Sequence, residues 1–175
     1  MWAMAAIFAY IGFMRGWNKE IIATSGIILG LFALFEFDDV LQNLLVQLPD
    51  DQKFVVRAVI FSVIVYFSYQ TRALIGAAAE RARGSGDGRD SLQSSVLGGI
   101  VGLFNGYLIW GSLWYWLHVT NYPLSPYISA PLPNSASANF VESLPLYVLA
   151  GGPGGDGNLL AAAMIALFLV VLIVI

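Results

Sequence analysis

The sequence contains no cysteine and only one histidine among its 175 residues. Without thiols the chain has no disulfide, no thiolate nucleophile and no thiolate metal site. The single histidine, His118, provides neither a histidine pair for a metal ion nor an acid–base pair for catalysis. We therefore expect no enzyme, and no catalytic, cofactor-binding or metal-binding residues.

Charged residues are scarce as well. Asp, Glu, Lys and Arg make up 11% of the chain, against about 25% in soluble proteins. The net charge of −3 gives no basis for nucleic-acid binding. Hydrophobic residues make up 58% of the chain, more than a globular protein of this size can bury. We therefore expect the lipid bilayer as solvent and an all-α fold, a polytopic transmembrane helical bundle.

The first 35 residues hold two apolar runs separated by a polar break that contains Arg15, Gly16, Lys19 and Glu20. One continuous helix would be about 52 Å long and would place these charges near the centre of a ~30 Å hydrocarbon core. Gly16 permits a turn at the break. The sequence therefore predicts a hairpin of helices Trp2–Met14 and Ile21–Phe35.

Two further spans complete a predicted four-helix core in residues 1–117. They are Phe54–Ala79 and Val96–Leu117. The extracytoplasmic loop 36–53 carries apolar residues at helical spacing after Asp38, which predicts a short amphipathic helix with Asp38 as its N-cap.

The last third of the chain has a different composition from the predicted core. Residues 118–157 form a Pro/Gly-rich extracytoplasmic segment, in which Phe140–Leu149 is predicted to dock on the membrane. Residues 158–175 are predicted as a fifth, C-terminal transmembrane helix. An aromatic belt is expected where the fourth span leaves the bilayer, formed by Trp110, Trp114, Tyr115 and Trp116.

Glycines recur at four-residue spacing, which lets membrane helices approach closely. The pairs are Gly12/Gly16 and Gly26/Gly30, and the fourth span carries a triple of Gly98, Gly102 and Gly106. We interpret the triple as a packing seam against Gly26 and Gly30. Asn105 lies beside it and is predicted to hydrogen-bond between helices.

Polar residues in the third span indicate two further features. A stripe of Ser62, Tyr66, Tyr69 and Gln70 is expected to face the bundle interior. Arg57, at the outer end of the span, either extends its charge to the membrane surface or pairs with an acidic residue of the preceding loop.

The basic residues give the orientation. They gather in the first and third connections, which the positive-inside rule makes cytoplasmic: Arg15, Lys19, Arg72, Arg81, Arg83 and Arg89. The second connection is acid-rich and residues 121–156 contain no Lys or Arg. The N-terminus is therefore predicted outside the cell.

The order of these motifs resembles the colicin V production protein (CvpA) family. Arg15-Gly-Trp-Asn-Lys-Glu20 followed by Gly26 is similar to the family's Arg-Gly-x-x-x-Glu signature. Val96-Leu-Gly-Gly-Ile-Val-Gly-Leu-Phe-Asn-Gly106 resembles its glycine-rich fourth helix, and Arg57 also fits. The similarity covers about Met1–Leu117. It implies a bacterial inner-membrane protein linked to toxin production or secretion, with no established chemistry.

Three features depart from the family pattern. Asn105 replaces an Arg often found there, Leu92-Gln-Ser-Ser95 replaces Asp-Arg, and the fifth apolar run is additional to the usual four helices. Together the observations leave three hypotheses of function. The first is a non-enzymatic membrane protein supporting export or envelope processes. The second is a structural accessory subunit of a larger respiratory or photosynthetic complex. The third, a small transporter or channel, depends on the polar stripe alone.

The expected partners are the lipid bilayer and either a membrane protein or a second copy of the chain. The residues expected to matter most for structure or function are Arg15, Gly16, Glu20, Gly26, Gly30, Arg57, Gly98, Gly102, Asn105 and Gly106.

Overall fold

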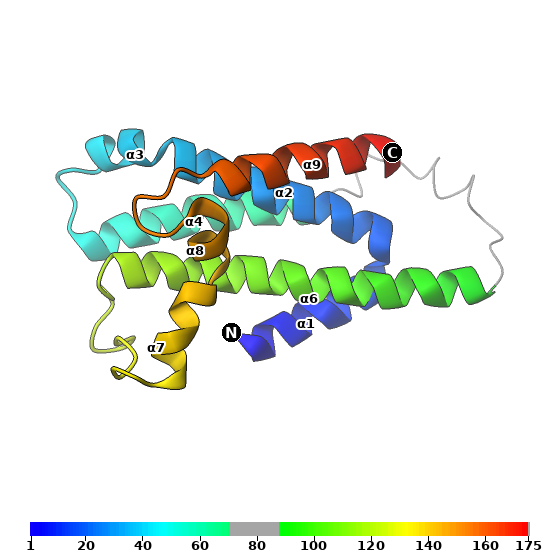
Figure 1. Cartoon of the computed structure of the whole chain (residues 1–175), viewed down its shortest axis with the longest axis horizontal. Coiled ribbons are helices and arrows are strands. Elements are labelled where there is room, and N and C mark those ends of the chain that lie inside the picture. Colours follow the sequence, from blue (N-terminus) through cyan, green and yellow to red (C-terminus); the bar gives the residue numbers. More distant parts are fainter. Residues whose placement is uncertain (71–87, 175) are drawn as a thin grey trace.

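The computed structural model describes residues 1–70 and 88–174, and this part of the chain is helical without strands. The longer helices run along one common direction (Figure 1). Its elements are α1 (Trp2–Arg15), α2 (Trp17–Glu36), α3 (Asp38–Leu44), α4 (Asp50–Tyr69), α6 (Gly88–Val119), α7 (Ala136–Phe140), η2 (Val141–Ser143), α8 (Pro145–Ala150) and α9 (Asn158–Val174). The predicted all-α class is confirmed.

Three helices are long and apolar enough to cross a membrane: α2, α4 and residues Leu92–Val119 of α6. The apolar helices α1 and α9 are shorter, with 14 and 17 residues. At about 1.5 Å per residue, α1 is ~21 Å long, less than a ~30 Å hydrocarbon core. The fold thus supports a multi-pass bundle, and the count of four spans plus one stays a prediction.

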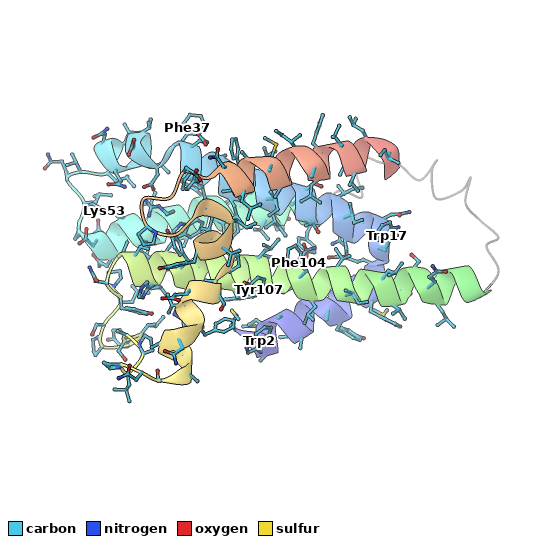
Figure 2. All side chains as sticks on the ribbon, in the orientation of Figure 1. Trp2, Trp17, Phe37, Lys53, Phe104 and Tyr107 are labelled. Carbon is cyan, nitrogen blue, oxygen red and sulfur yellow. The ribbon has the colours of Figure 1, made fainter. Side chains whose placement is uncertain are left out.

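The predicted break between the first two helices is confirmed. It lies at Gly16, whose φ of 78° belongs to the region that favours glycine. Gly16 ends α1 and precedes α2, so the two helices meet at one end of the bundle, which we call the hairpin end. Figure 2 shows Trp17 at this end and Lys53 at the opposite one, which we call the α3 end.

The glycine triple of α6 packs against α1, and our prediction that it packs against Gly26 and Gly30 is wrong. A Cβ atom added to Gly98 would overlap the carbonyl oxygen of Gly12, and one added to Gly106 would lie 2.6 Å from Ala5 Cα. These contacts leave room for hydrogen only, so the α1–α6 seam depends on glycine.

Gly26 and Gly30 instead form the contact of α2 with α4. A Cβ added to Gly26 would overlap the Ser68 side chain, and one added to Gly30 would lie 2.7 Å from Ile64 Cγ2. Both glycine sets of the sequence are therefore packing sites, with different partners from those predicted.

The polar stripe of α4 does not face the interior. Ser62, Tyr66 and Gln70 are exposed, and only Tyr69 turns into the bundle. Ser62 needs no partner from another helix, since its hydroxyl donates to the Ala58 carbonyl of its own helix. The transporter hypothesis thereby loses the observation on which it rested. The predicted span Phe54–Ala79 begins earlier, at Asp50, and its residues after Gln70 lie outside the described part of the chain.

Asp38 is the first residue of α3 rather than its N-cap, because Phe37 occupies that position. The Asp38 carboxylate makes no capping bond, and instead accepts hydrogen bonds from Gln42 and Arg57. The predicted amphipathic helix is therefore present but short, ending at Leu44 without a buried residue.

The segment from α7 to α8 packs on the bundle, and the docking of Phe140–Leu149 on the membrane stays a prediction. Leu144 and Leu146 are buried, and Pro145 packs on Gly111 of α6. In Figure 1, α7 lies on the same side of α6 as the N-terminus, and α8 lies between α6 and α9, both of which it contacts. The glycine seam between α1 and α6 runs from Gly98 to Gly106, and the segment from α7 to α8 covers α6 further along, at Gly111.

The aromatic belt is correspondingly covered in part by protein. Tyr115 and Trp116 are buried, and Trp116 packs edge-to-face on Phe61 with ring centroids 5.1 Å apart. Trp114 stacks on Phe140. Helix α9 then lies along α2 (Figure 1) and buries Leu160 against the core.

Candidate functional site

A buried polar cluster lies near the hairpin end, around the carboxylate of Glu20. Glu20 is fully buried in the first turn of α2. Its Oε1 accepts a hydrogen bond from Arg15 Nη1 at 2.6 Å, and its Oε2 accepts one from Tyr69 Oη at 3.1 Å. A position at the positive N-terminal end of a helix also favours the carboxylate.

Arg15 connects this carboxylate to the end of α4. Its Nη2 donates to the backbone carbonyl of Tyr69 at 3.1 Å, and its guanidinium lies 4.5 Å from the centre of the Tyr69 ring. The carbonyl is one of those left without an intrahelical donor at a helix C-terminus, so the arginine caps α4. Arg15 thus balances the charge of Glu20 and holds α1 to α4.

Asn105 brings α6 into the cluster. Its Nδ2 donates to Glu20 Oε2 at 2.9 Å, and its Oδ1 accepts from Thr24 Oγ1 at 2.7 Å. Asn105 and Thr24 are 0% and 3% exposed, so unpaired polar atoms here would carry a full desolvation penalty. The five side chains join α1, α2, α4 and α6.

Three residues of the cluster were predicted from the sequence to be important. The role of the other two was not predicted. Arg15, Glu20 and Asn105 were predicted as important, and the structure brings all three together. Thr24 was missed, although it lies one helical turn after Glu20 on the same face. Tyr69 was noticed only as a member of the stripe of α4.

The glycines lie around this cluster rather than within it. Gly16 forms the break, Gly98, Gly102 and Gly106 form the seam with α1, and Gly26 and Gly30 contact α4. The seam lets α6 approach α1 closely, and that approach is the reason Asn105 can reach Glu20 across the bundle.

A second charged group lies at the α3 end. Arg57 of α4 donates to the carboxylate of Asp38 at the start of α3, as one of the two alternatives predicted, and only 13% of its side chain is exposed. Lys53 pairs nearby with Asp50 at 3.0 Å on a more exposed surface. Arg57 therefore belongs to a site separate from the Glu20 cluster.

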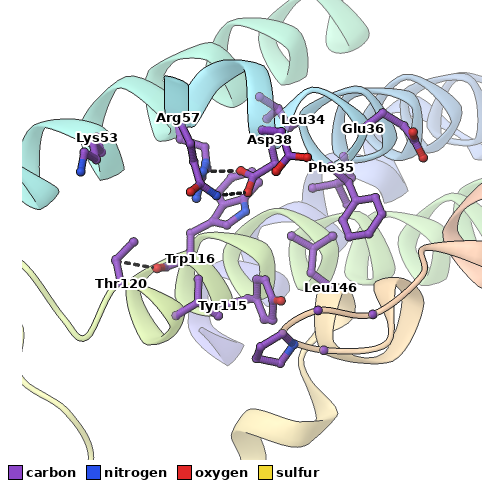
Figure 3. Close-up of a pocket in the computed structure, with 18 of the residues that line it drawn as sticks. Leu34, Phe35, Glu36, Asp38, Lys53, Arg57, Tyr115, Trp116, Thr120 and Leu146 are labelled. Carbon is purple, nitrogen blue, oxygen red and sulfur yellow. Dashed lines mark hydrogen bonds and ion pairs between the residues drawn. The ribbon is translucent and has the colours of Figure 1, made fainter. Parts of the chain in front are cut away.

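The Arg57–Asp38 pair borders a cavity of 820 Å³, which we call the α3 cavity (Figure 3). Its walls come from the end of α2, from α3, from the start of α4, from the end of α6 and from residues 152–155. In Figure 3, Tyr115 and Leu146 lie across from Asp38, and the Trp116 ring lies beside the Arg57–Asp38 pair.

His118 lies near this end of α6 and contacts Tyr122. The ring centroids are 5.9 Å apart, and the Tyr122 hydroxyl also accepts from Trp114 Nε1 at 3.1 Å. Across residues 1–70 and 88–174, no three His, Asp or Glu side chains are grouped to hold a metal ion. The histidine therefore takes part in aromatic packing.

Comparison with known proteins gives one family. A family model described as colicin V production protein matches residues 1–145, which extends beyond the region of about Met1–Leu117 that carried the resemblance. No curated protein and no solved structure shows significant similarity to the chain.

Proposed function

Because the chain belongs to the colicin V production protein family, we propose that it is a non-enzymatic protein of the bacterial inner membrane that supports export or envelope processes such as toxin production. The family match and the apolar helices together make it a multi-pass membrane protein. In the proposed orientation, the N-terminus lies outside and the connections rich in Arg and Lys lie in the cytoplasm.

The observation that carries the proposal is the closed hydrogen bonding of Glu20. A catalytic or transporting carboxylate needs an approach for its substrate. Glu20 is fully buried, and its two carboxylate oxygens already accept from Arg15, Tyr69 and Asn105. This arrangement supports a structural role, in which the cluster fixes the relative positions of four helices and so the surfaces that partners meet.

The proposal is tested by complementing a deletion strain with variants of the full chain. We expect Glu20→Gln to remove function by leaving Arg15 without its counter-charge, and Gly102→Leu to do so by separating α6 from α1. Glu142→Gln, at an exposed carboxylate, is the matched control. The measurements are toxin secretion, detergent sensitivity of the cells and the amount of protein in the membrane. Wild-type values for both test variants would overturn the proposal.

The alternative hypothesis is that the protein is an accessory subunit of a larger complex. Extraction in mild detergent, followed by sizing and mass spectrometry, distinguishes it from the proposal. Migration alone or as a small homo-oligomer supports the proposal. Stoichiometric migration with a large respiratory or photosynthetic complex would replace it with the accessory role. Loss of that association on deleting residues 158–175 would then identify α9 as the docking helix.

A further inference from the structure

The α3 cavity has the size and the walls of a small-molecule site. Its volume of 820 Å³ lies within the roughly 300–1,000 Å³ of typical ligand pockets. Apolar and aromatic side chains form part of its lining, namely Leu31, Leu34, Phe35, Tyr115, Trp116 and Leu146. Five of these are buried in the core, and Trp116 packs against Phe61, so this wall is formed before any ligand binds.

The other side of the cavity carries an excess of negative charge. Its lining includes four carboxylates, from Glu36, Asp38, Asp39 and Asp50, and two basic side chains. Both basic side chains are already neutralised, because Arg57 pairs with Asp38 and Lys53 pairs with Asp50. Within the described part of the chain, the carboxylates of Glu36 and Asp39 form no ion pair, and both residues are exposed at the rim.

The residues around the α3 cavity add to its negative charge. Residues 36–57 and 118–157, which carry the α3 end of the bundle, contain seven acidic and two basic side chains. A cleft lined by one sign of charge concentrates ligands of the opposite sign. The α3 cavity therefore combines attraction for a cation with an apolar wall for a hydrocarbon group.

We propose that the α3 cavity binds an amphiphile that carries an ammonium group. The ammonium lies at the rim formed by Glu36 and Asp39, and the apolar part lies against Leu34 and Trp116. Aromatic faces add to the attraction for an ammonium ion, and Phe35 and Tyr115 supply them in the same cavity. Two sources offer this chemistry: the headgroup of a phosphatidylethanolamine from the membrane, and a soluble organic amine.

The test uses the purified full-length protein in detergent micelles and two pairs of probes. Native mass spectrometry compares phosphatidylethanolamine with phosphatidylglycerol of the same acyl chains. Calorimetry compares 2-phenylethylamine with 2-phenylethanol, which has a similar shape and no charge. The variant Glu36→Gln/Asp39→Asn removes the two unpaired rim charges. The control Asp51→Asn/Glu142→Gln removes two charges from the same end, outside the cavity lining.

Preference for phosphatidylethanolamine, weakened roughly tenfold by the rim variant and less than about twofold by the control, supports a lipid ligand. The same pattern for 2-phenylethylamine supports a soluble amine. Equal binding of each amine and its partner probe, or equal effects of the two variants, would overturn the proposal. The rim variant changes two exposed side chains and the control changes one exposed and one partly buried side chain. Circular dichroism verifies that both variants fold. Because export is not measured, failure of the function proposed above leaves this result unaffected.

Discussion

The side-chain amide of Asn105 on α6 donates to the carboxylate of Glu20 on α2 at 2.9 Å, across a sequence separation of 85 residues. Both residues are fully buried. The contact is the point at which the family's charged signature near residue 15 meets the glycine-rich helix near residue 100. It joins these two parts of the sequence into one polar cluster.

Replacing Asn105 with alanine should destabilise the bundle. Glu20 loses one of the three donors to its carboxylate, and Thr24 keeps only the Glu20 backbone carbonyl as acceptor. Loss of a hydrogen bond to a charged group costs about 1.5–3 kcal/mol. The measurement is the free energy of unfolding in mixed micelles with increasing denaturing detergent. Asn43→Ala, at an exposed position, is the control. Equal stability of the two variants would show that Asn105 contributes nothing measurable.

Arg15 and Glu20 should show strong coupling in a double-mutant cycle. Glu20→Gln leaves a partly buried guanidinium without its counter-charge, and breaking such a pair costs on the order of 3 kcal/mol. Combining it with Arg15→Gln removes both charges, so the double variant should lose less stability than the sum of the single losses. The same unfolding assay measures all four proteins. Additive losses would mean that the two charges act independently.

The α1–α6 seam should tolerate no side chain at Gly102 and accept one at Gly99. A Cβ at Gly102 would overlap the carbonyl oxygen of Phe8, whereas one at Gly99 would lie 3.4 Å from the Ala9 carbonyl oxygen. We expect Gly102→Ala to cost about 1–3 kcal/mol by forcing the helices apart, and Gly99→Ala to cost much less. Thermal unfolding in detergent compares them. A Gly99→Ala protein as unstable as Gly102→Ala would contradict this account of the seam.

The natural absence of cysteine allows a direct test of the proposed orientation. Single cysteines are introduced as Asn18→Cys at the hairpin end and Asp51→Cys at the α3 end. In intact cells, a thiol reagent that does not cross the membrane should label Asp51→Cys only. Permeabilised cells, in which both react, are the control. Labelling of Asn18→Cys alone would reverse the orientation.

The sequence by itself determined the class of the protein and the position of its first break. Long apolar runs require helices in lipid, because every backbone donor must be satisfied within the segment. Charges at Arg15 and Glu20, beside a glycine able to adopt positive φ, exclude a continuous helix there. These are local properties, so hydropathy and backbone geometry were sufficient to predict them.

Tertiary structure alone decided which surfaces meet. A glycine shows in sequence that something approaches closely, but it gives no information about what does, and for this reason the partners of Gly102 and Gly26 were predicted wrongly. The inward face of α4 was also mispredicted, since Ser62 is satisfied by its own helix while Tyr69 finds Glu20 only after α2 and α4 pack. Hydrogen bonds between helices depend on the rotation of each helix about its axis, and the packing of all the helices together fixes that rotation.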